Sequence, residues 1–169
     1  MDVAEYENAV REHKDRVYSF AVHLLRDTEE GRDVAQEALV RLFTHRDAVI
    51  PEAARAWLLR TAHRLCLDRL RQRVSRPQAE PEVLESVAAG SSGRPDHQAA
   101  GRQLGVRIEA ALASLSPRDR SLLLLREVHG MPYEEMADTL AVPLGTLKAA
   151  LHRARERCRQ ALLGAGVQP

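Results

Sequence analysis

The segment that most constrains the fold of this chain runs from Gly130 to Arg159, GMPYEEMADTLAVPLGTLKAALHRARERCR. A helix is expected to begin near Pro132, because proline fits a first helical turn and the two glutamates after Tyr133 place negative charge at the positive end of the helix dipole. Pro143 ends that helix, since proline disfavours helical geometry in the residue before it. A second helix is expected from about Leu144. The segment therefore predicts two short helices that cross at a tight turn.

The second of these helices has an apolar face and a basic face. Five apolar or small residues recur at helical spacing: Leu147, Leu151, Ala154, Cys158 and Ala161. From Lys148 to Arg159 there are five basic residues and one acidic residue, in a chain whose net charge is +1. This local excess suits phosphate binding, although an amphipathic hairpin with a solvated basic face is the alternative. In a complex with DNA, we expect Thr146, Lys148 and Ala149 to approach base edges in the major groove. The candidates for phosphate binding are Arg153, Arg155 and Arg157, and His152 lies with them on the basic face.

The first 47 residues predict two helices, of which the second is acidic. Asp2 with Glu5 resembles a capping box and predicts a helix over 3–25, and Asp27 opens a second helix that ends near Thr44. From Asp27 to Asp47 there are six acidic residues and three basic residues. Such a helix suits a basic protein partner better than DNA. Three of its polar residues lie on overlapping faces of the helix: Asp33, Gln36 and Glu37. They are candidates for binding such a partner, and the alternative is that they belong to an ordinary solvated helix face.

A third helix is expected from about Ala53 to Arg73, and it is strongly basic. Its apolar residues share one side: Leu58, Leu59, Ala62, Leu65, Cys66 and Leu70. Arg60, Arg64 and Arg71 cluster on the other side. From Arg55 to Arg76 there are seven arginines and one acidic residue, Asp68. Two basic helices in a nearly neutral chain favour one shared polyanion.

The chain is expected to form two domains. Residues 75–96 are rich in Pro, Gly, Ser and Glu, which predicts a flexible linker between domains at 1–74 and 97–169. In the second domain a helix from Gln98 to Ala113 is expected to turn Leu104 and Ile108 inward, and Ser116 and Pro117 start the next helix. Few aromatic residues and little β-branched alternation predict an all-α protein of two small helical domains, with the C-terminal one a helix-turn-helix.

Several classes of function have no support in the sequence. The chain contains no Ser-His-Asp grouping, no phosphate-binding glycine loop and no metal-ligand spacing among its seven histidines, so neither an enzyme nor a cofactor or metal site is expected. Cys66 and Cys158 are expected to be structural. There is no apolar run of membrane length and no signal peptide pattern, so we expect a cytoplasmic protein without membrane insertion.

Taken together, these motifs resemble the extracytoplasmic-function (ECF) group of bacterial sigma factors, of the sigma-70 family. In the C-terminal half, the segment LASLSPRDRSLLLLREVHGMPYEEMADTLAVPLGTLKAALHRAR is similar to the last conserved region of the family. In the N-terminal half the resemblance rests on Asp33-Val-Ala-Gln36-Glu37, on Trp57-Leu58, and on Asp68 with the arginines after it. The resemblance implies a subunit that binds core RNA polymerase and directs promoter recognition, DNA melting and transcription initiation.

The resemblance also implies roles for particular residues. Core polymerase would be bound by Asp33, Gln36 and Glu37. The loop from His45 to Arg55 would hold an unstacked base of the minus-ten element, and the nearby DNA backbone would be followed by Arg60, Arg64, Arg69 and Arg71. The basic helix of the C-terminal half would read the minus-thirty-five element, and an anti-sigma factor is an expected partner. The alternative is a stand-alone helix-turn-helix regulator, which leaves the acidic helix without a role.

The chain departs from the family pattern in three places. Arg64 stands where the family usually has Asn. The family commonly has Ser-Arg where Ala149-Ala150 stand, so one basic contact in the major groove is expected to be missing. Gly31 and Arg32 stand where an Ala-Glu pair is common, and we expect Gly31 to weaken its helix locally by about 1 kcal/mol relative to Ala.

Overall fold

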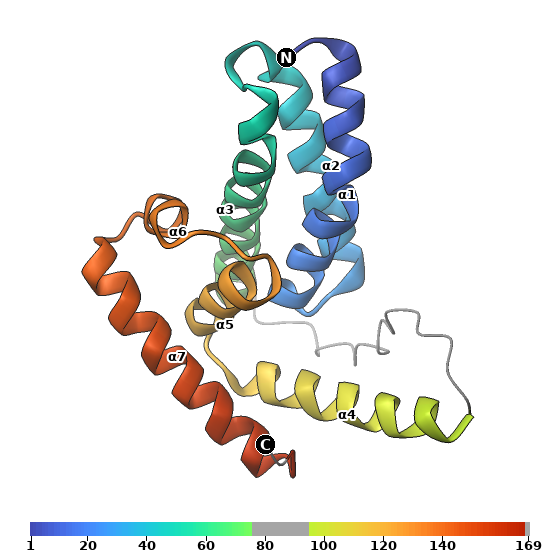
Figure 1. Ribbon diagram of the computed structural model, residues 1–169, viewed down its shortest axis with the longest axis vertical. Coiled ribbons are helices and arrows are strands. Elements are labelled where there is room, and N and C mark those ends of the chain that lie inside the picture. Colours follow the sequence, from blue (N-terminus) through green and yellow to red (C-terminus); the bar gives the residue numbers. More distant parts are fainter. Residues whose placement is uncertain (76–94, 168–169) are drawn as a thin grey trace.

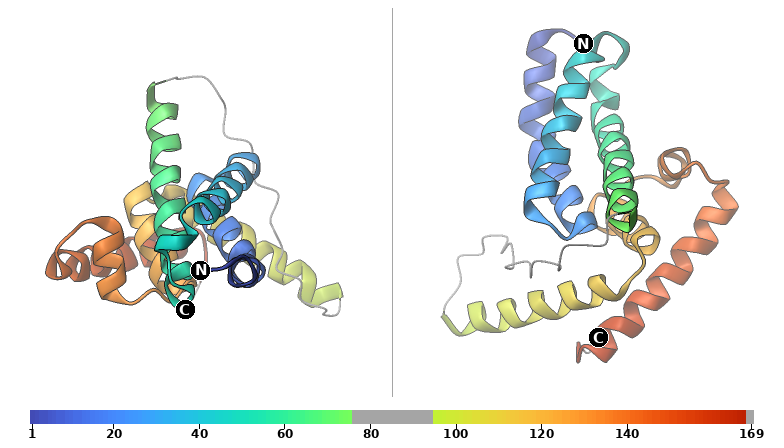
Figure 2. Two further views of the ribbon diagram at one scale, coloured as in Figure 1. Left: turned by 90° about the horizontal axis from the view of Figure 1, so that it is seen from above. Right: turned by 180° about the vertical axis from the view of Figure 1, so that it is seen from behind.

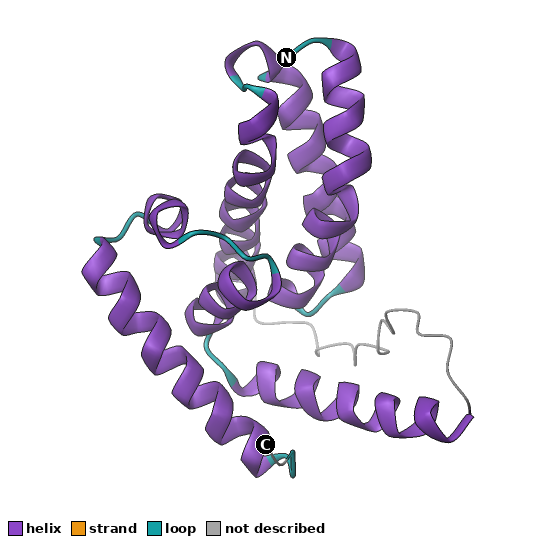
Figure 3. Ribbon diagram, in the orientation of Figure 1, coloured by secondary structure: helices purple, strands orange, loops and turns teal. Residues whose placement is uncertain are grey.

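The computed structural model of the protein describes residues 1–75 and 95–167, and it confirms the all-α prediction in that part of the chain. Two of the described segments are short 3-10 turns, Arg46–Ala48 and Pro51–Ala53. Over the same residues Figure 3 shows helices joined by loops and no strand. Most of the predicted linker, residues 76–94, lies outside the described residues.

Three helices form the N-terminal half: α1 (Val3–Leu25), α2 (Thr28–Thr44) and α3 (Ala54–Ser75). They pack side by side as an upright bundle (Figure 1). The capping box at the start of α1 is confirmed, because the Glu5 N–H donates to Asp2 Oδ1 (2.8 Å) and the Asp2 N–H donates to Glu5 Oε2 (2.7 Å). The apolar faces predicted for α1 and α3 meet in the centre of the bundle, where Phe20, Leu24 and Leu58 are fully buried.

Gly31 has a different role from the one expected from the sequence. It lies in the first turns of α2, where α2 crosses the end of α1. A Cβ atom at this position would lie 2.5 Å from Val22 Cγ2 and 2.8 Å from Val22 Cα. The expectation that alanine would strengthen the helix is therefore wrong for the folded protein, because only glycine permits this close approach.

The C-terminal half consists of α4 (Pro95–Ser114), α5 (Pro117–Leu123), a π-helical turn (Leu124–Val128), α6 (Tyr133–Leu140) and α7 (Leu144–Gly164). The predicted cap of α5 is confirmed, since the Asp119 N–H donates to Ser116 Oγ at 3.1 Å. Leu104 and Ile108 were expected to point inward, but they are 45% and 40% exposed. The reason is that α4 runs away from the rest of the molecule toward its N-terminus, and only its C-terminal part is covered (Figure 1).

The two halves are packed against each other. Buried apolar residues of both halves form one continuous cluster, in which the end of α1 meets α5 and the π-helical turn. The view from behind in Figure 2 shows α5 directly below the three-helix bundle, with α4 and α7 diverging from it. This packing fixes the orientation of the basic helices α3 and α7 within one molecule.

Candidate nucleic-acid interface

The helix-turn-helix is built by α6 and α7. Met136 and Leu147 are fully buried between the two helices. The turn is made by Ala141, which adopts the left-handed conformation (φ 54°), and by the Val142 N–H, which donates to the Ala137 carbonyl at 3.0 Å. Small residues at Ala137 and Ala141 leave room for this turn.

The outer surface of α7 carries the residues predicted to contact DNA. All six are exposed to solvent: Thr146, Lys148, Ala149, His152, Arg153 and Arg155. Ala150, the neighbour of Ala149, is instead buried. The structure thus brings a hydroxyl, a lysine, a histidine and two arginines together on the exposed side of one helix, which is a suitable surface for a phosphate backbone and for base edges.

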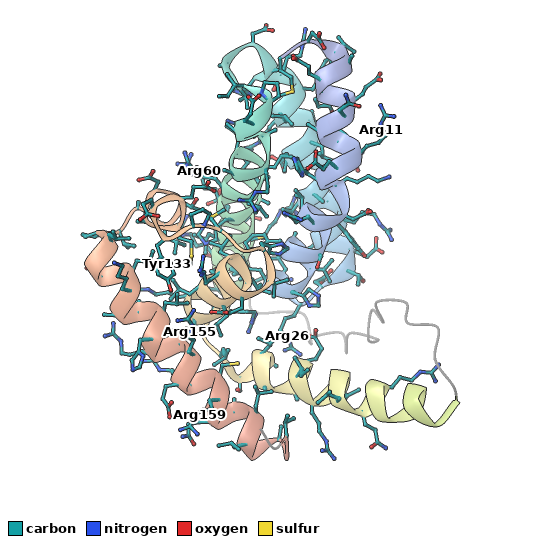
Figure 4. The ribbon with its side chains drawn as sticks, in the orientation of Figure 1. Arg11, Arg26, Arg60, Tyr133, Arg155 and Arg159 are labelled. Atoms are coloured by element: carbon teal, nitrogen blue, oxygen red, sulfur yellow. The ribbon has the colours of Figure 1, made fainter. Side chains whose placement is uncertain are left out.

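Two arginines of α7 make ion pairs with residues outside this helix. Arg155 Nε donates to Glu127 Oε1 (2.8 Å), and this hydrogen bond raises the pKa of the Arg155 guanidinium. Figure 4 shows Arg155 along the middle of α7, on the side where Tyr133, the first residue of α6, also lies. Arg157 Nη1 donates to both carboxylate oxygens of Asp119 (3.0 and 2.9 Å). Arg157 therefore ties α7 to α5, and the sequence did not indicate this role.

The arginines of α3 are not equally accessible. Arg64 and Arg71 are exposed, and Arg71 Nη1 donates to Asp68 Oδ1 at 2.9 Å. Arg69 and Arg60 are partly buried; Arg69 Nη2 lies 3.9 Å from Glu37 Oε2, and Arg60 Nε is buried without a hydrogen-bond partner among the described residues. The four predicted DNA contacts of α3 therefore divide into two exposed side chains and two partly buried ones.

Arg73, at the end of the same helix, stabilises the fold. Its Nη1 donates to the Leu25 carbonyl (2.8 Å) at the C-terminus of α1, and its Nη2 donates to Glu30 Oε2 (2.8 Å). A guanidinium at a helix C-terminus satisfies a carbonyl that has no partner within the helix. The basic composition of α3 thus combines surface charge with structural contacts.

The three polar residues singled out on α2, Asp33, Gln36 and Glu37, differ in their exposure to solvent. Asp33 and Gln36 are exposed, while Glu37 is half-buried because Arg41 Nη2 donates to its Oε1 at 2.6 Å. The nearby Arg69 shares the same carboxylate. The carboxylate of Asp33 and the amide of Gln36 are therefore the more available groups for a partner.

An aromatic cluster lies at the end of α2, next to the loop from His45 to Arg55. Phe43 is 41% exposed, its ring packs edge-on against Tyr6 (5.1 Å between centroids), and the Arg46 guanidinium lies 4.4 Å above it. The ring of His45 lies 5.9 Å from that of Trp57. Sequence reasoning missed Phe43, although an aromatic residue beside a loop was the available signal, whereas Arg46 belongs to the loop that was singled out.

Buried titratable groups lie away from these surfaces. Burial lowers the pKa of His63 and of His129 to about 4, and burial raises the pKa of the Cys66 thiol to about 12. Within the described residues no group of three His, Cys, Asp or Glu side chains is placed to hold a metal ion. None of the described helices has the length and apolar character needed to cross a membrane.

Comparison with known proteins identifies the family. The chain matches the models of sigma-70 region 2 over residues 9–76 and of sigma-70 region 4 over residues 105–158. It is 32% identical over 162 residues to the RNA polymerase sigma-E factor of Streptomyces avermitilis, covering 95% of this chain and 87% of that protein. The ECF sigma factor SigE of Mycolicibacterium smegmatis is 35% identical over 158 residues. The chain belongs to the ECF sigma factors.

The two matched regions coincide with the two halves of this sigma factor. Region 2 spans nearly all of α1 to α3, and region 4 spans the end of α4 to the middle of α7. The match to SigE spans 93% of this chain but only 61% of the length of SigE. The fold is shared with the sigma factor RpoE of Bartonella quintana, solved in complex with the anti-sigma factor NepR (TM-score 0.76, 22% identity, 95% of this chain and 98% of that chain).

Proposed function

We propose that this sigma factor binds core RNA polymerase in the cytoplasm and directs it to promoters, where it supports DNA melting and transcription initiation. The observation that carries the proposal is the presence of both sigma-70 regions in one chain, each with an exposed surface of suitable charge. A stand-alone regulator would use α7 alone and would have no need for the acidic side of α2. In this proposal the chain recognises the promoter, and the polymerase catalyses RNA synthesis.

We propose that α7 reads the minus-thirty-five element. Thr146, Lys148 and Ala149 lie in its first two turns, next to the turn of the helix-turn-helix, and this is the end that enters the major groove in such motifs. The neighbouring surface carries His152, Arg153 and Arg155 for the phosphate backbone. The Glu127 carboxylate supports this role by holding Arg155 in one orientation beside α6.

We propose that the N-terminal half binds the minus-ten element. Arg64 and Arg71 offer exposed charge for the DNA backbone, with Arg60 and Arg69 on the same helix. The exposed ring of Phe43 lies at the end of α2, next to the loop from His45 to Arg55, and the guanidinium of Arg46, in that loop, lies over it. Aromatic rings and arginine planes bind unstacked bases through stacking, so this cluster suits a base that has left the duplex.

We propose that Asp33, Gln36 and Glu37 bind a basic surface of the core polymerase, and that the functional division of the chain is 1–74 and 97–169. An anti-sigma factor is a further proposed partner, by analogy with the complex in which the sigma factor RpoE was solved. Asp33 and Gln36 are exposed on α2, which leaves them accessible to either partner.

Transcription with core polymerase on a pool of randomised promoters tests the proposal. Defined two-part promoters are expected only when the protein is present. Lys148→Ala should weaken selection of the minus-thirty-five element but not of the minus-ten element. Arg159→Ala, at the far end of the same helix, should leave selection of the minus-thirty-five element unchanged. If the protein does not bind core polymerase yet binds duplex DNA, the stand-alone regulator is the correct function.

Charge reversal tests the polymerase contact separately. Asp33→Lys with Glu37→Lys should reduce binding to core polymerase while leaving the fold intact. Glu7→Lys with Glu12→Lys makes the same change of charge on the exposed side of α1 and serves as the matched control. Equal loss in the two variants would show a general charge effect and would contradict the assignment.

A further inference from the structure

Ala149 lies near the centre of the side of α7 that faces away from the protein. The buried residues of this helix are Leu147, Ala150, Leu151 and Ala154. Because an α-helix turns by about 100° per residue, Gly145, Ala149 and His152 follow one line along the opposite side. All three are exposed to solvent. In its first two turns, α7 therefore presents only a glycine and a methyl group along this outward line.

Gly145 has no role within the protein that requires glycine. It lies inside α7 without a positive φ, and an added Cβ atom would meet no atom of the described residues within 4 Å. Glycine also weakens a helix relative to alanine. A glycine at an exposed helical position permits the backbone to approach a ligand closely, so the line from Gly145 to Ala149 is suited to contact with a ligand.

Polar and basic side chains border this line on both sides. One edge carries Lys148 and Arg155, the other edge carries Thr146 and Arg153, and all four side chains are exposed. The basic side chains can extend past the line to phosphates or to a guanine edge. The side chain of Ala149 has no hydrogen-bond donor or acceptor, so it can contribute only an apolar contact.

The departure from the family pattern at Ala149-Ala150 affects the outward side of α7 at one position. Ala150 is only 7% exposed and lies on the side of α7 that packs against the protein. Ala149 is the exposed member of the pair and stands where the family commonly has Ser. A serine hydroxyl can form hydrogen bonds with more than one base, whereas a methyl group forms none.

Thymine is the base whose major-groove edge an apolar side chain can recognise. It carries a C5-methyl group there, whereas the other bases present hydrogen-bond donors and acceptors. A polar edge placed against a methyl side chain loses its water without gaining a partner. Ala149 is therefore expected to favour thymine by contact with its methyl group and by the exclusion of polar groups.

We propose that Ala149 is a specificity-determining residue, which selects a thymine in the minus-thirty-five element by packing its methyl group against the C5-methyl group of that base. Gly145 assists by letting the backbone of α7 approach the groove closely. The thymine can stand in either strand, since both strands present their methyl groups in the major groove. This inference deepens the proposed function of α7 and rests on it.

Deoxyuridine in place of thymine tests this contact, because it removes only the C5-methyl group. A minus-thirty-five element is first selected from the randomised promoter pool with the holoenzyme, and each of its thymines is then replaced in turn by deoxyuridine. At one thymine the replacement should weaken binding of the holoenzyme about fourfold, which is the effect expected for one buried methyl group. If no thymine is selected, or if every deoxyuridine duplex binds as tightly as the original, the proposal is overturned.

Ala149→Gly assigns the contact to one side chain, since it removes the methyl group from α7. This variant should bind the thymine and deoxyuridine duplexes equally, whereas Ala4→Gly, the same change at an exposed position of α1, should keep the difference between them. Circular dichroism shows whether the variant keeps its helices, and Ala149→Ser replaces it if it does not. A difference that persists without the Ala149 methyl group would overturn the assignment.

Gly145→Ala tests the close approach of the backbone. The added Cβ atom meets no atom of the described residues, so the variant should be at least as stable as the parent protein in a thermal scan. It should nevertheless bind the selected promoter several-fold more weakly. Gly101→Ala, where an added Cβ atom also meets open space, is the matched control and should leave binding unchanged. Equal binding by Gly145→Ala and the parent protein would contradict the close approach.

Failure of the proposed function would give a different result. If the protein directs no transcription with core polymerase, duplexes are selected by binding to the full chain alone, because a stand-alone regulator would also read DNA with α7. The same deoxyuridine comparison is then made on those duplexes. A loss of affinity that depends on the Ala149 methyl group would support the role of Ala149 while overturning the sigma function, and no loss would overturn both.

Discussion

Gly31→Ala gives the sharpest test of how the N-terminal half is packed. In an isolated helix, alanine in place of glycine stabilises the helical state by about 1 kcal/mol. In the folded protein, the added Cβ would lie 2.5 Å from Val22 Cγ2 and 2.8 Å from both Cα and N of Val22. Overpacking of this kind costs roughly 1–3 kcal/mol, and backbone atoms cannot rotate away as a side chain can. We take the upper value and expect a net destabilisation of about 2 kcal/mol.

Urea denaturation followed by far-ultraviolet circular dichroism measures this difference, and a thermal scan should show a decrease of about 4–8 °C in Tm. Gly101→Ala is the matched control, since it lies inside α4 and a Cβ there meets no atom within 4 Å. That variant should be as stable as the parent protein or slightly more stable. If Gly31→Ala is also as stable as the parent, the close contact between α1 and α2 does not constrain the fold and the reasoning is refuted.

Three further predictions concern buried groups. Arg157→Ala leaves the buried carboxylate of Asp119 without its bidentate partner, and we expect a loss of about 1–2 kcal/mol in the free energy of unfolding, measured in urea. Because burial lowers the pKa of His63 from 6.5 to about 4, its neutral form contributes fully above pH 6.5 and the contribution is lost as the pH falls toward 4. At pH 5 this amounts to about 2 kcal/mol, so the Tm of a His63→Leu variant should depend less on pH. Cys66, whose pKa burial raises to about 12, should react with iodoacetamide more slowly than the half-buried Cys158; equal rates in the folded protein would contradict its burial.

The sequence by itself determined which segments are helical and where most of them begin. Capping signals at Asp2 and Ser116 predicted the starts of α1 and α5, and the hydrogen bonds of both caps are present. The helix-turn-helix followed from Pro143 and from the spacing of Leu147 and its neighbours, because turn geometry and helical periodicity depend on residues close together in the chain. The exposed basic side of α7 was predictable for the same reason.

Only the tertiary structure decided which helical faces are covered and which charged side chains are paired within the protein. The sequence placed Leu104 and Ile108 inside, but whether a helical face is covered depends on a partner that is distant in the sequence, and this part of α4 has little cover. Likewise the sequence indicated Arg157 and Arg60 as DNA contacts, while in the fold Arg157 binds Asp119 and the Nε atom of Arg60 is buried. Composition fixes how much charge a helix carries, but the packing of the two halves determines which charges a ligand can reach.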